Sequence, residues 1–176
     1  DRCDSVVIDP HKWLFAPFDC CALLYRKPEV ARLAHTQHAS YLDPINSGSE
    51  WNPTDYGHFL TRRARGLPFW FSLAVHGTRA YSEAVERTLE VTRAGAELVD
   101  ATPHLDLVLD PILSVLAFRR IGWEQADYDA WSVRLMEDGT AFVLPTQVDG
   151  EPALRICIVN PLTTVDDIAM ILDSLA

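Results

Sequence analysis

Lys12 has the surroundings in this sequence that best suit covalent chemistry. It lies in residues 9–14 (DPHKWL), between two apolar segments, 5–8 and 20–25, that we expect to form buried strands. A lysine beside a core must keep its ammonium in water, pair it or lose its proton, and desolvation favours the neutral amine. A neutral amine is a nucleophile that forms imines with carbonyl compounds. The alternative is that Lys12 simply leaves the end of a strand for solvent, as most lysines do.

The sequence around this lysine resembles that of a known family. Residues 4–20 (DSVVIDPHKWLFAPFDC) closely resemble the cofactor-lysine segment of the pyridoxal-phosphate-dependent group II amino acid decarboxylases, which include aromatic amino acid, histidine and glutamate decarboxylases. Three later segments follow in the family's order. Residues 40–42 are similar to the tyrosine segment of its mobile catalytic loop, 61–67 to its arginine-rich segment, and 69–77 to the helix that comes next.

The resemblance implies a fold and a domain organisation. The fold class would be α/β, with the fold-type I architecture of pyridoxal-phosphate-dependent transferases. Residues 1–66 would be the C-terminal part of the large cofactor-binding domain, with the cofactor lysine and the mobile loop, and 67–176 the small α+β C-terminal domain. The chain has no initiator methionine and enters at once a strand that the family places in mid-chain. We therefore expect a C-terminal fragment whose activity requires a missing N-terminal part.

The resemblance also implies the chemistry. Lys12 would carry pyridoxal 5'-phosphate as a Schiff base, and the intact enzyme would convert an L-amino acid to its amine and carbon dioxide. His11, which precedes the lysine, would help to hold the cofactor phosphate. Tyr41 would return a proton to the substrate Cα, with Tyr56 as a competitor for that role. Tyr41 lies in a polar segment, 36–55, that has few apolar anchors and that we expect to be mobile in the free enzyme.

Two other functions stay open. A fold-type I aminotransferase would use the same lysine but retain the substrate carboxylate and bind it with an arginine, for which Arg155 is the candidate. The chain by itself could also be a noncatalytic fragment, because it lacks the segments that would enclose the cofactor.

Three arginines form a basic cluster in this acidic chain, and the cluster has two interpretations. Arg62, Arg63 and Arg65 either pair with acids on the surface, or one of them organises the entrance of the site or an intersubunit contact. Guanidinium groups suit the recognition of carboxylate and phosphate, which keeps the second interpretation open.

The composition of the chain argues against some classes of binding partner. The 176 residues carry 25 acidic against 15 basic side chains, a net charge of −10, which argues against nucleic acid and anionic membranes as partners. No apolar run is long enough to span a bilayer, and no N-terminal apolar segment indicates secretion. The expected location is the cytoplasm.

The resemblance implies a small-molecule amino acid substrate and a homodimer of the full-length protein.

No metal site is expected. The four cysteines have no metal-ligand spacing, and we interpret them as buried thiols. His35 and His38 are three residues apart, but no carboxylate or thiol nearby completes a set of ligands.

Periodicity predicts the elements that position these residues. Pro28 suits the first turn of a helix, and apolar residues at helical spacing predict a helix that stops at Gly77 and a second that follows it. Beyond it, the predicted order is strand, strand, helix, strand, strand, helix, over residues 105–108, 112–118, 124–136, 141–144, 153–159 and 164–175. Thr164 would cap the last helix, with Asp167 completing a capping box.

Overall fold

The computed structural model describes residues 2–42, 44 and 52–176. The chain divides into two compact units, Asp1–Val75 and His76–Ala176. This division falls inside a long helix, whereas the predicted domain boundary between residues 66 and 67 lies at the start of that helix. That boundary concerns the domains of the complete protein and stays a prediction.

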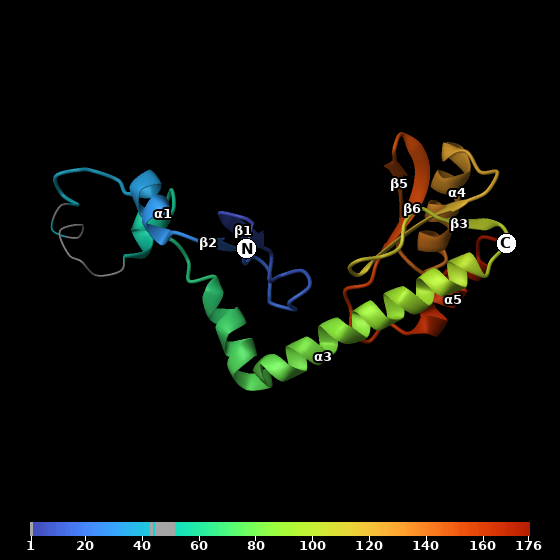
Figure 1. Cartoon of the computed structure of the whole chain (residues 1–176), viewed down its shortest axis with the longest axis horizontal. Coiled ribbons are helices and arrows are strands. Elements are labelled where there is room, and N and C mark those ends of the chain that lie inside the picture. The colour runs from blue at the N-terminus through green and yellow to red at the C-terminus, as the bar shows by residue number, and fades with distance from the viewer. Residues whose placement is uncertain (1, 43, 45–51) are drawn as a thin grey trace. The chain divides into compact units, whose positions relative to one another are not determined.

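The first unit is built around a strand pair. β1 (Ser5–Ile8) and β2 (Ala22–Tyr25) run antiparallel, with Ser5 opposite Tyr25 and Ile8 opposite Ala22 (Figure 1). α1 (Pro28–His35) follows directly, and its first residue is the proline that the sequence predicts for this position. The short 3₁₀ helix η1 (Pro53–Tyr56) packs on α1, where the buried Asp55 accepts a 3.0 Å hydrogen bond from Arg32 Nε.

The strands of the first unit are exposed, so the prediction that they are buried is wrong for this chain. Val7 in β1 is 62% exposed and Leu24 in β2 is 53% exposed. A two-stranded sheet has no third strand beside it, and no described element covers the faces of this one. The apolar character of these segments was recognised correctly, but burial depends on neighbours that the segments themselves do not contain.

The prediction of four buried thiols is also wrong. Cys20 is buried, but Cys3, Cys21 and Cys157 are exposed. Cys3 precedes β1, and Cys21, directly before β2, is exposed although its neighbour Cys20 is buried. Cys157 ends a strand of the second unit on its exposed face.

α3 (Gly66–Asp100) is two helices joined at Gly77, as the sequence predicts. Gly77 has φ +77° and ψ 157°, a conformation that only glycine adopts without strain, so the helical hydrogen bonding is interrupted there.

The second unit is a four-stranded antiparallel sheet with helices packed on it. Its strands are β3 (Leu105–Leu107), β4 (Val115–Arg120), β5 (Leu144–Val148) and β6 (Glu151–Cys157), in the order β3-β4-β6-β5. α4 (Gln125–Glu137) lies between β4 and β5 in the chain, and α5 (Val165–Asp173) ends it. The predicted order of two strands, helix, two strands and helix is therefore confirmed (Figure 1).

One buried cluster joins the sheet to the later part of α3 and to α4 and α5. Its fully buried members include Val99, Phe118, Trp131, Leu154 and Ile168. Gly95 of α3 lies so close to the sheet that an added Cβ would approach Leu116 to 3.1 Å and Ile168 to 3.2 Å. The absence of a side chain at Gly95 thus lets the helix backbone approach the core.

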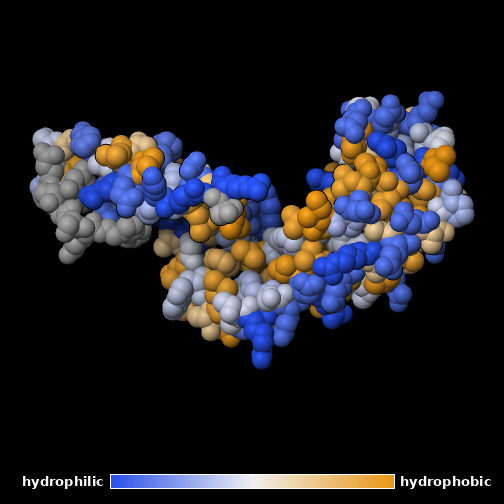
Figure 2. All heavy atoms as spheres, viewed as in Figure 1, coloured by the Kyte–Doolittle hydropathy of each residue, from blue (hydrophilic) through white to orange (hydrophobic). Residues whose placement is uncertain are grey.

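Strand boundaries differ from the predictions at two places. The predicted strand 141–144 shares only Leu144 with β5, and the predicted strand 112–118 begins before β4, which starts at Val115. Ile112 is instead 88% exposed in the preceding loop. Apolar side chains lie on the surface of both units, where they appear orange in Figure 2. No helix within the described residues is long and apolar enough to cross a bilayer.

The predicted mobile loop falls partly outside the described residues. Residues 43 and 45–51 of this loop are not among the described residues. The prediction that the segment 36–55 is mobile therefore stays untested. On its described part, Tyr41 follows α1 on a turn that Leu42 closes by donating its N–H to the Ala39 carbonyl at 2.8 Å.

Candidate active site

The connection between β1 and β2 is folded compactly rather than extended. Lys12 N–H donates to the Asp9 carbonyl at 3.0 Å, and Ala16 N–H donates to the Pro10 carbonyl at 2.9 Å. Ala16 and Pro10 are buried, so the connection has a small interior of its own. These backbone bonds hold residues 9–16 in a turn that presents Lys12 at the end of the strand pair.

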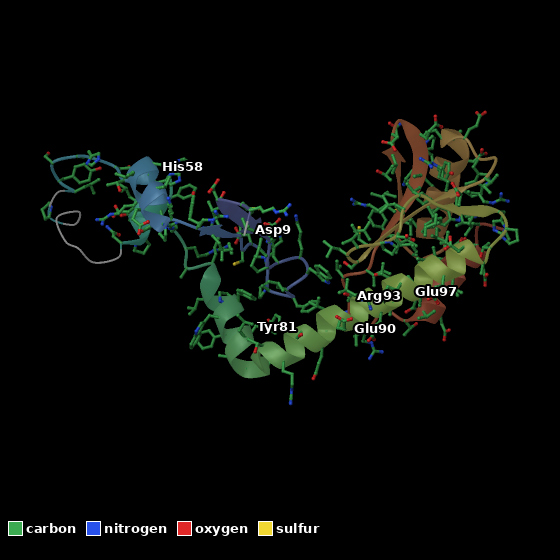
Figure 3. The ribbon with its side chains drawn as sticks, viewed as in Figure 1. Asp9, His58, Tyr81, Glu90, Arg93 and Glu97 are labelled. Atoms are coloured by element: carbon green, nitrogen blue, oxygen red, sulfur yellow. The ribbon has the colours of Figure 1, made fainter. Side chains whose placement is uncertain are left out.

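The Lys12 side chain is accessible and paired. Its Nζ lies 2.6 Å from Asp9 Oδ2, and 67% of the side chain is exposed, against 31% for Asp9. Of the three outcomes open to a lysine in this position, the structure therefore shows pairing in contact with solvent. Asp9 is labelled in Figure 3, beside β1.

Asp9 also accepts a hydrogen bond from the Cys21 thiol. The hydrogen bond from Lys12 lowers the pKa of the Asp9 carboxyl, with a smaller contribution from Cys21. Partial loss of hydration and the hydrogen bond to Asp9 raise the pKa of the Cys21 thiol, so Cys21 is held in its neutral form at neutral pH. Asp9 thus links the two ends of the connection through one carboxylate.

His11 is fixed by residues from the other end of the same connection. Its Nδ1 lies 2.5 Å from the Cys20 carbonyl oxygen, and its ring meets the Phe18 ring edge-on, with centroids 5.2 Å apart. The ring is therefore held on two sides next to Lys12. This arrangement suits a residue that must keep one orientation beside a bound group.

Tyr41 is not brought together with Lys12. Its side chain is 70% exposed, and no hydrogen bond joins it to Lys12 among the residues that the structure describes. Tyr56, the competitor, lies in η1, which packs on α1. Neither tyrosine is placed at the lysine, and the role of each stays a prediction.

The three arginines divide into two groups. Arg63 and Arg65 both donate to the Asp19 carboxylate, Arg63 through Nη2 and Arg65 through Nε at 3.0 Å. Arg62 donates instead to the Pro53 carbonyl. The hydrogen bond from Arg65 is the main cause that lowers the pKa of Asp19 to about 2, and Arg63 adds to it. Two of the arginines therefore pair with an acid of the Lys12 connection.

Sequence reasoning missed Asp9 and Asp19 as partners. Asp9 could have been found, because a separation of three residues in a turn places its carboxylate next to Lys12. Asp19 gave no such signal, since its partners lie 44 and 46 residues further along the chain.

Arg155, the residue that would support an aminotransferase, belongs to the second unit. It lies on β6 opposite Leu144 of β5 and is exposed. Together with Thr146 and Cys157 it lines a pocket of about 600 Å³.

A family model and individual relatives both relate this chain to decarboxylases. Residues 1–121 match the family model of the pyridoxal-dependent decarboxylase conserved domain. An L-2,4-diaminobutyrate decarboxylase of Rhizobium meliloti (strain 1021) is 31% identical over 183 residues, covering 99% of this chain and 37% of the relative. An aromatic-L-amino-acid decarboxylase of Bacillus atrophaeus is 27% identical over 180 residues, covering 97% and 38%.

A solved structure shows the same fold. The crystal structure of Oryza sativa TDC with PLP and tryptamine superposes with a TM-score of 0.85 at 23% identity, covering 99% of this chain and 39% of that one. The chain thus spans less than two fifths of the length of these relatives. The predicted α/β fold, the C-terminal portion of a fold-type I enzyme, is confirmed. With the family model matching more than half of its residues, the chain belongs to the pyridoxal-dependent decarboxylase family.

Proposed function

We propose that the complete protein decarboxylates an L-amino acid to its amine and carbon dioxide with pyridoxal 5'-phosphate, and that Lys12 is the attachment point of the cofactor. The observation that carries this proposal is the position of Lys12. Its amine lies on a compact turn at the end of two strands, accessible and next to an immobilised imidazole, within the segment that matches the family.

The residues present fit the cofactor. An accessible primary amine is the group that an aldehyde needs, and Lys12 and Lys27 are the only lysines in the sequence. Lys27 precedes the first turn of α1, and within the described part of the chain it has neither a compact turn nor a carboxylate partner like those of Lys12. When bound, pyridoxal phosphate supplies the electron sink that accepts the electron pair left by the departing carboxylate.

The residues of this chain have distinct roles in the proposal. Lys12 Nζ would hold the cofactor, and Asp9 would pair with the Lys12 ammonium, at 2.6 Å, in the cofactor-free protein. His11, held by Cys20 and Phe18, would offer an imidazole of fixed orientation to the cofactor phosphate. Tyr41 delivers the phenolic proton to the substrate Cα, which requires its loop to reach the site. The proposal also includes a homodimer as the form of the complete protein.

The test compares the two lysines in the full-length protein. After borohydride reduction, mass spectrometry should find a pyridoxyl group on the Lys12 peptide of the wild type and of Lys27→Ala, and none in Lys12→Ala. Product analysis should show amine and carbon dioxide rather than a keto acid, which separates a decarboxylase from an aminotransferase. A pyridoxyl group that persists elsewhere in Lys12→Ala would refute the assignment.

A further inference from the structure

A three-residue ion cluster ties the Lys12 connection to the segment that leads into α3. We call Asp19, Arg63 and Arg65 the Asp19 clamp. Each carboxylate oxygen has its own guanidinium: Oδ1 accepts from Arg63, and Oδ2 accepts from Arg65 Nε at 3.0 Å. Arg65 is the less exposed of the two arginines, with 44% of its side chain accessible against 70% for Arg63. A carboxylate bound by a guanidinium on each oxygen cannot rotate without breaking a charged hydrogen bond.

The two segments also meet beyond the ion pairs. Pro17 and Phe18 from the connection and Ala64 and Pro68 from the later segment line one pocket of about 200 Å³ with the clamp. The contact therefore involves backbone neighbours on both sides and is more than two long side chains meeting in solvent.

The clamp is connected to Lys12 through His11. The two residues that flank Asp19 are the two that hold the imidazole, Phe18 by an edge-on ring contact and Cys20 by its carbonyl oxygen. His11 is the direct neighbour of Lys12 in the chain. Fixing Asp19 therefore fixes both supports of the ring that adjoins the lysine.

We propose that the Asp19 clamp is a positioning device that sets the orientation of His11 and Lys12 for the cofactor, an inference that rests on the proposed function. Exposed ion pairs contribute little to stability, so the consequence expected of the clamp is geometric. A misplacement of reacting groups by about 1 Å can cost about 100-fold in rate. The hydrogen bonds from Arg65 and, less strongly, from Arg63 lower the pKa of the Asp19 carboxyl to about 2, so the clamp stays charged well into the acidic range.

The experiment uses the full-length enzyme loaded with pyridoxal phosphate. Asp19→Asn keeps the size of the side chain and removes its charge. We expect kcat to fall about 10- to 100-fold with KM less affected, and the circular dichroism of the protein-bound cofactor to change. Arg62→Gln is the matched control, since Arg62 belongs to the same basic segment but binds the Pro53 carbonyl. It should keep the kcat and the spectrum of the wild type.

Two further variants separate a clamp from independent effects. If Asp19 acts through Arg65, the double variant Asp19→Asn, Arg65→Gln should be no worse than the more impaired of the two single variants. Arg65→Lys keeps the charge but loses the Nε geometry, so its kcat should fall between those of the wild type and Arg65→Gln. The two single Arg65 variants also test the proposal if Asp19→Asn does not fold. Losses that multiply in the double variant, or an equal loss in Arg62→Gln, would overturn the clamp.

Failure of the clamp and failure of the proposed function give different results. A wild type that places no pyridoxyl group on Lys12 refutes the function. In the cofactor-free protein, amide hydrogen exchange across residues 10–21 should be faster in Asp19→Asn than in the wild type and unchanged in Arg62→Gln. Unchanged exchange in Asp19→Asn, or a loaded Asp19→Asn enzyme with the kcat and spectrum of the wild type, refutes the clamp.

Discussion

The pair of Lys12 and Asp9 predicts a titration that can be measured directly. Because the Lys12 hydrogen bond lowers the pKa of Asp9 from its ordinary value of 3.8, the pair is complete above that value and is lost as the pH falls through the lower, folded-state value. In the cofactor-free protein, the carboxyl carbon of Asp9 should titrate by NMR below 3.8, and its midpoint should rise toward 3.8 in Lys12→Ala. An Asp9 midpoint that Lys12→Ala leaves unchanged would contradict the pair.

Replacement of Tyr41 tests its proposed role as the proton donor to the substrate Cα. Tyr41→Phe keeps the ring and removes only the phenolic proton, so carbon dioxide release should persist while amine formation falls by about 10²- to 10⁴-fold, as expected for loss of a general acid. Tyr56→Phe is the matched control and tests the competitor. Separate assays of carbon dioxide and amine make the measurement. An amine yield equal to that of the wild type would remove Tyr41 from the mechanism and direct attention to Tyr56.

The sequence could predict the local part of the site but not the long-range part. Lys12 and His11 are neighbours in a motif, so their proximity needed no knowledge of the fold. The contacts of Asp19 with Arg63 and Arg65 arise only when two distant segments fold against each other, and no periodicity records them. The position of Tyr41 relative to Lys12 depends on the loop 36–55. Residues 43 and 45–51 of that loop are not among the described residues.

Among the elements, α5 gives the sharpest test of local sequence rules. Thr164 Oγ1 accepts from the Asp167 N–H at 3.2 Å, and Asp167 Oδ2 accepts from the Thr164 N–H at 2.8 Å. Thr164→Ala should therefore lower the free energy of unfolding by about 0.5–2 kcal/mol, measured by urea denaturation of the full-length protein. Thr163→Ala, which alters the neighbouring threonine outside the box, should have a smaller effect. Equal losses in the two variants would show that the box is not the source of the stability.

The boundaries of the strands could not be predicted from the sequence as well as those of the helices. The predicted strand 141–144 stops just before Pro145, yet Pro145 lies inside β5, opposite Leu154. β5 is an edge strand in the order β3-β4-β6-β5, where a residue without an N–H is tolerated because one side of the strand has no partner. Whether a strand lies at an edge depends on the whole sheet. The helices, by contrast, were predicted well, because their periodicity and caps are local.

At the scale of the whole molecule, the two units differ in how completely they are built. Among the described residues of the first unit, the buried apolar residues are only Pro10, Ala16, Cys20, Ala31 and Leu42. The second unit has a continuous core from Val91 to Leu175. Burial of apolar surface is the main source of stability, so the second unit has the means to fold alone.

We therefore expect residues 76–176, expressed alone, to unfold cooperatively in urea. The transition, followed by far-ultraviolet circular dichroism, should have an m value of about 1–3 kcal/mol/M, as for other small domains. Residues 1–75 should show no cooperative transition under the same conditions. A gradual, noncooperative loss of signal from residues 76–176 would show that its core needs the remainder of the protein.

The hydrogen bond between His11 and Cys20 also determines the tautomer of the imidazole. A carbonyl oxygen only accepts, so Nδ1 must carry a proton, and in the neutral ring Nε2 is left with a lone pair. A lone pair repels phosphate oxygens, so His11 can donate to a phosphate through Nε2 only as the imidazolium. If His11 holds the cofactor phosphate through Nε2, the hydrogen bond is therefore a charge-assisted one, from a doubly protonated ring to an anion.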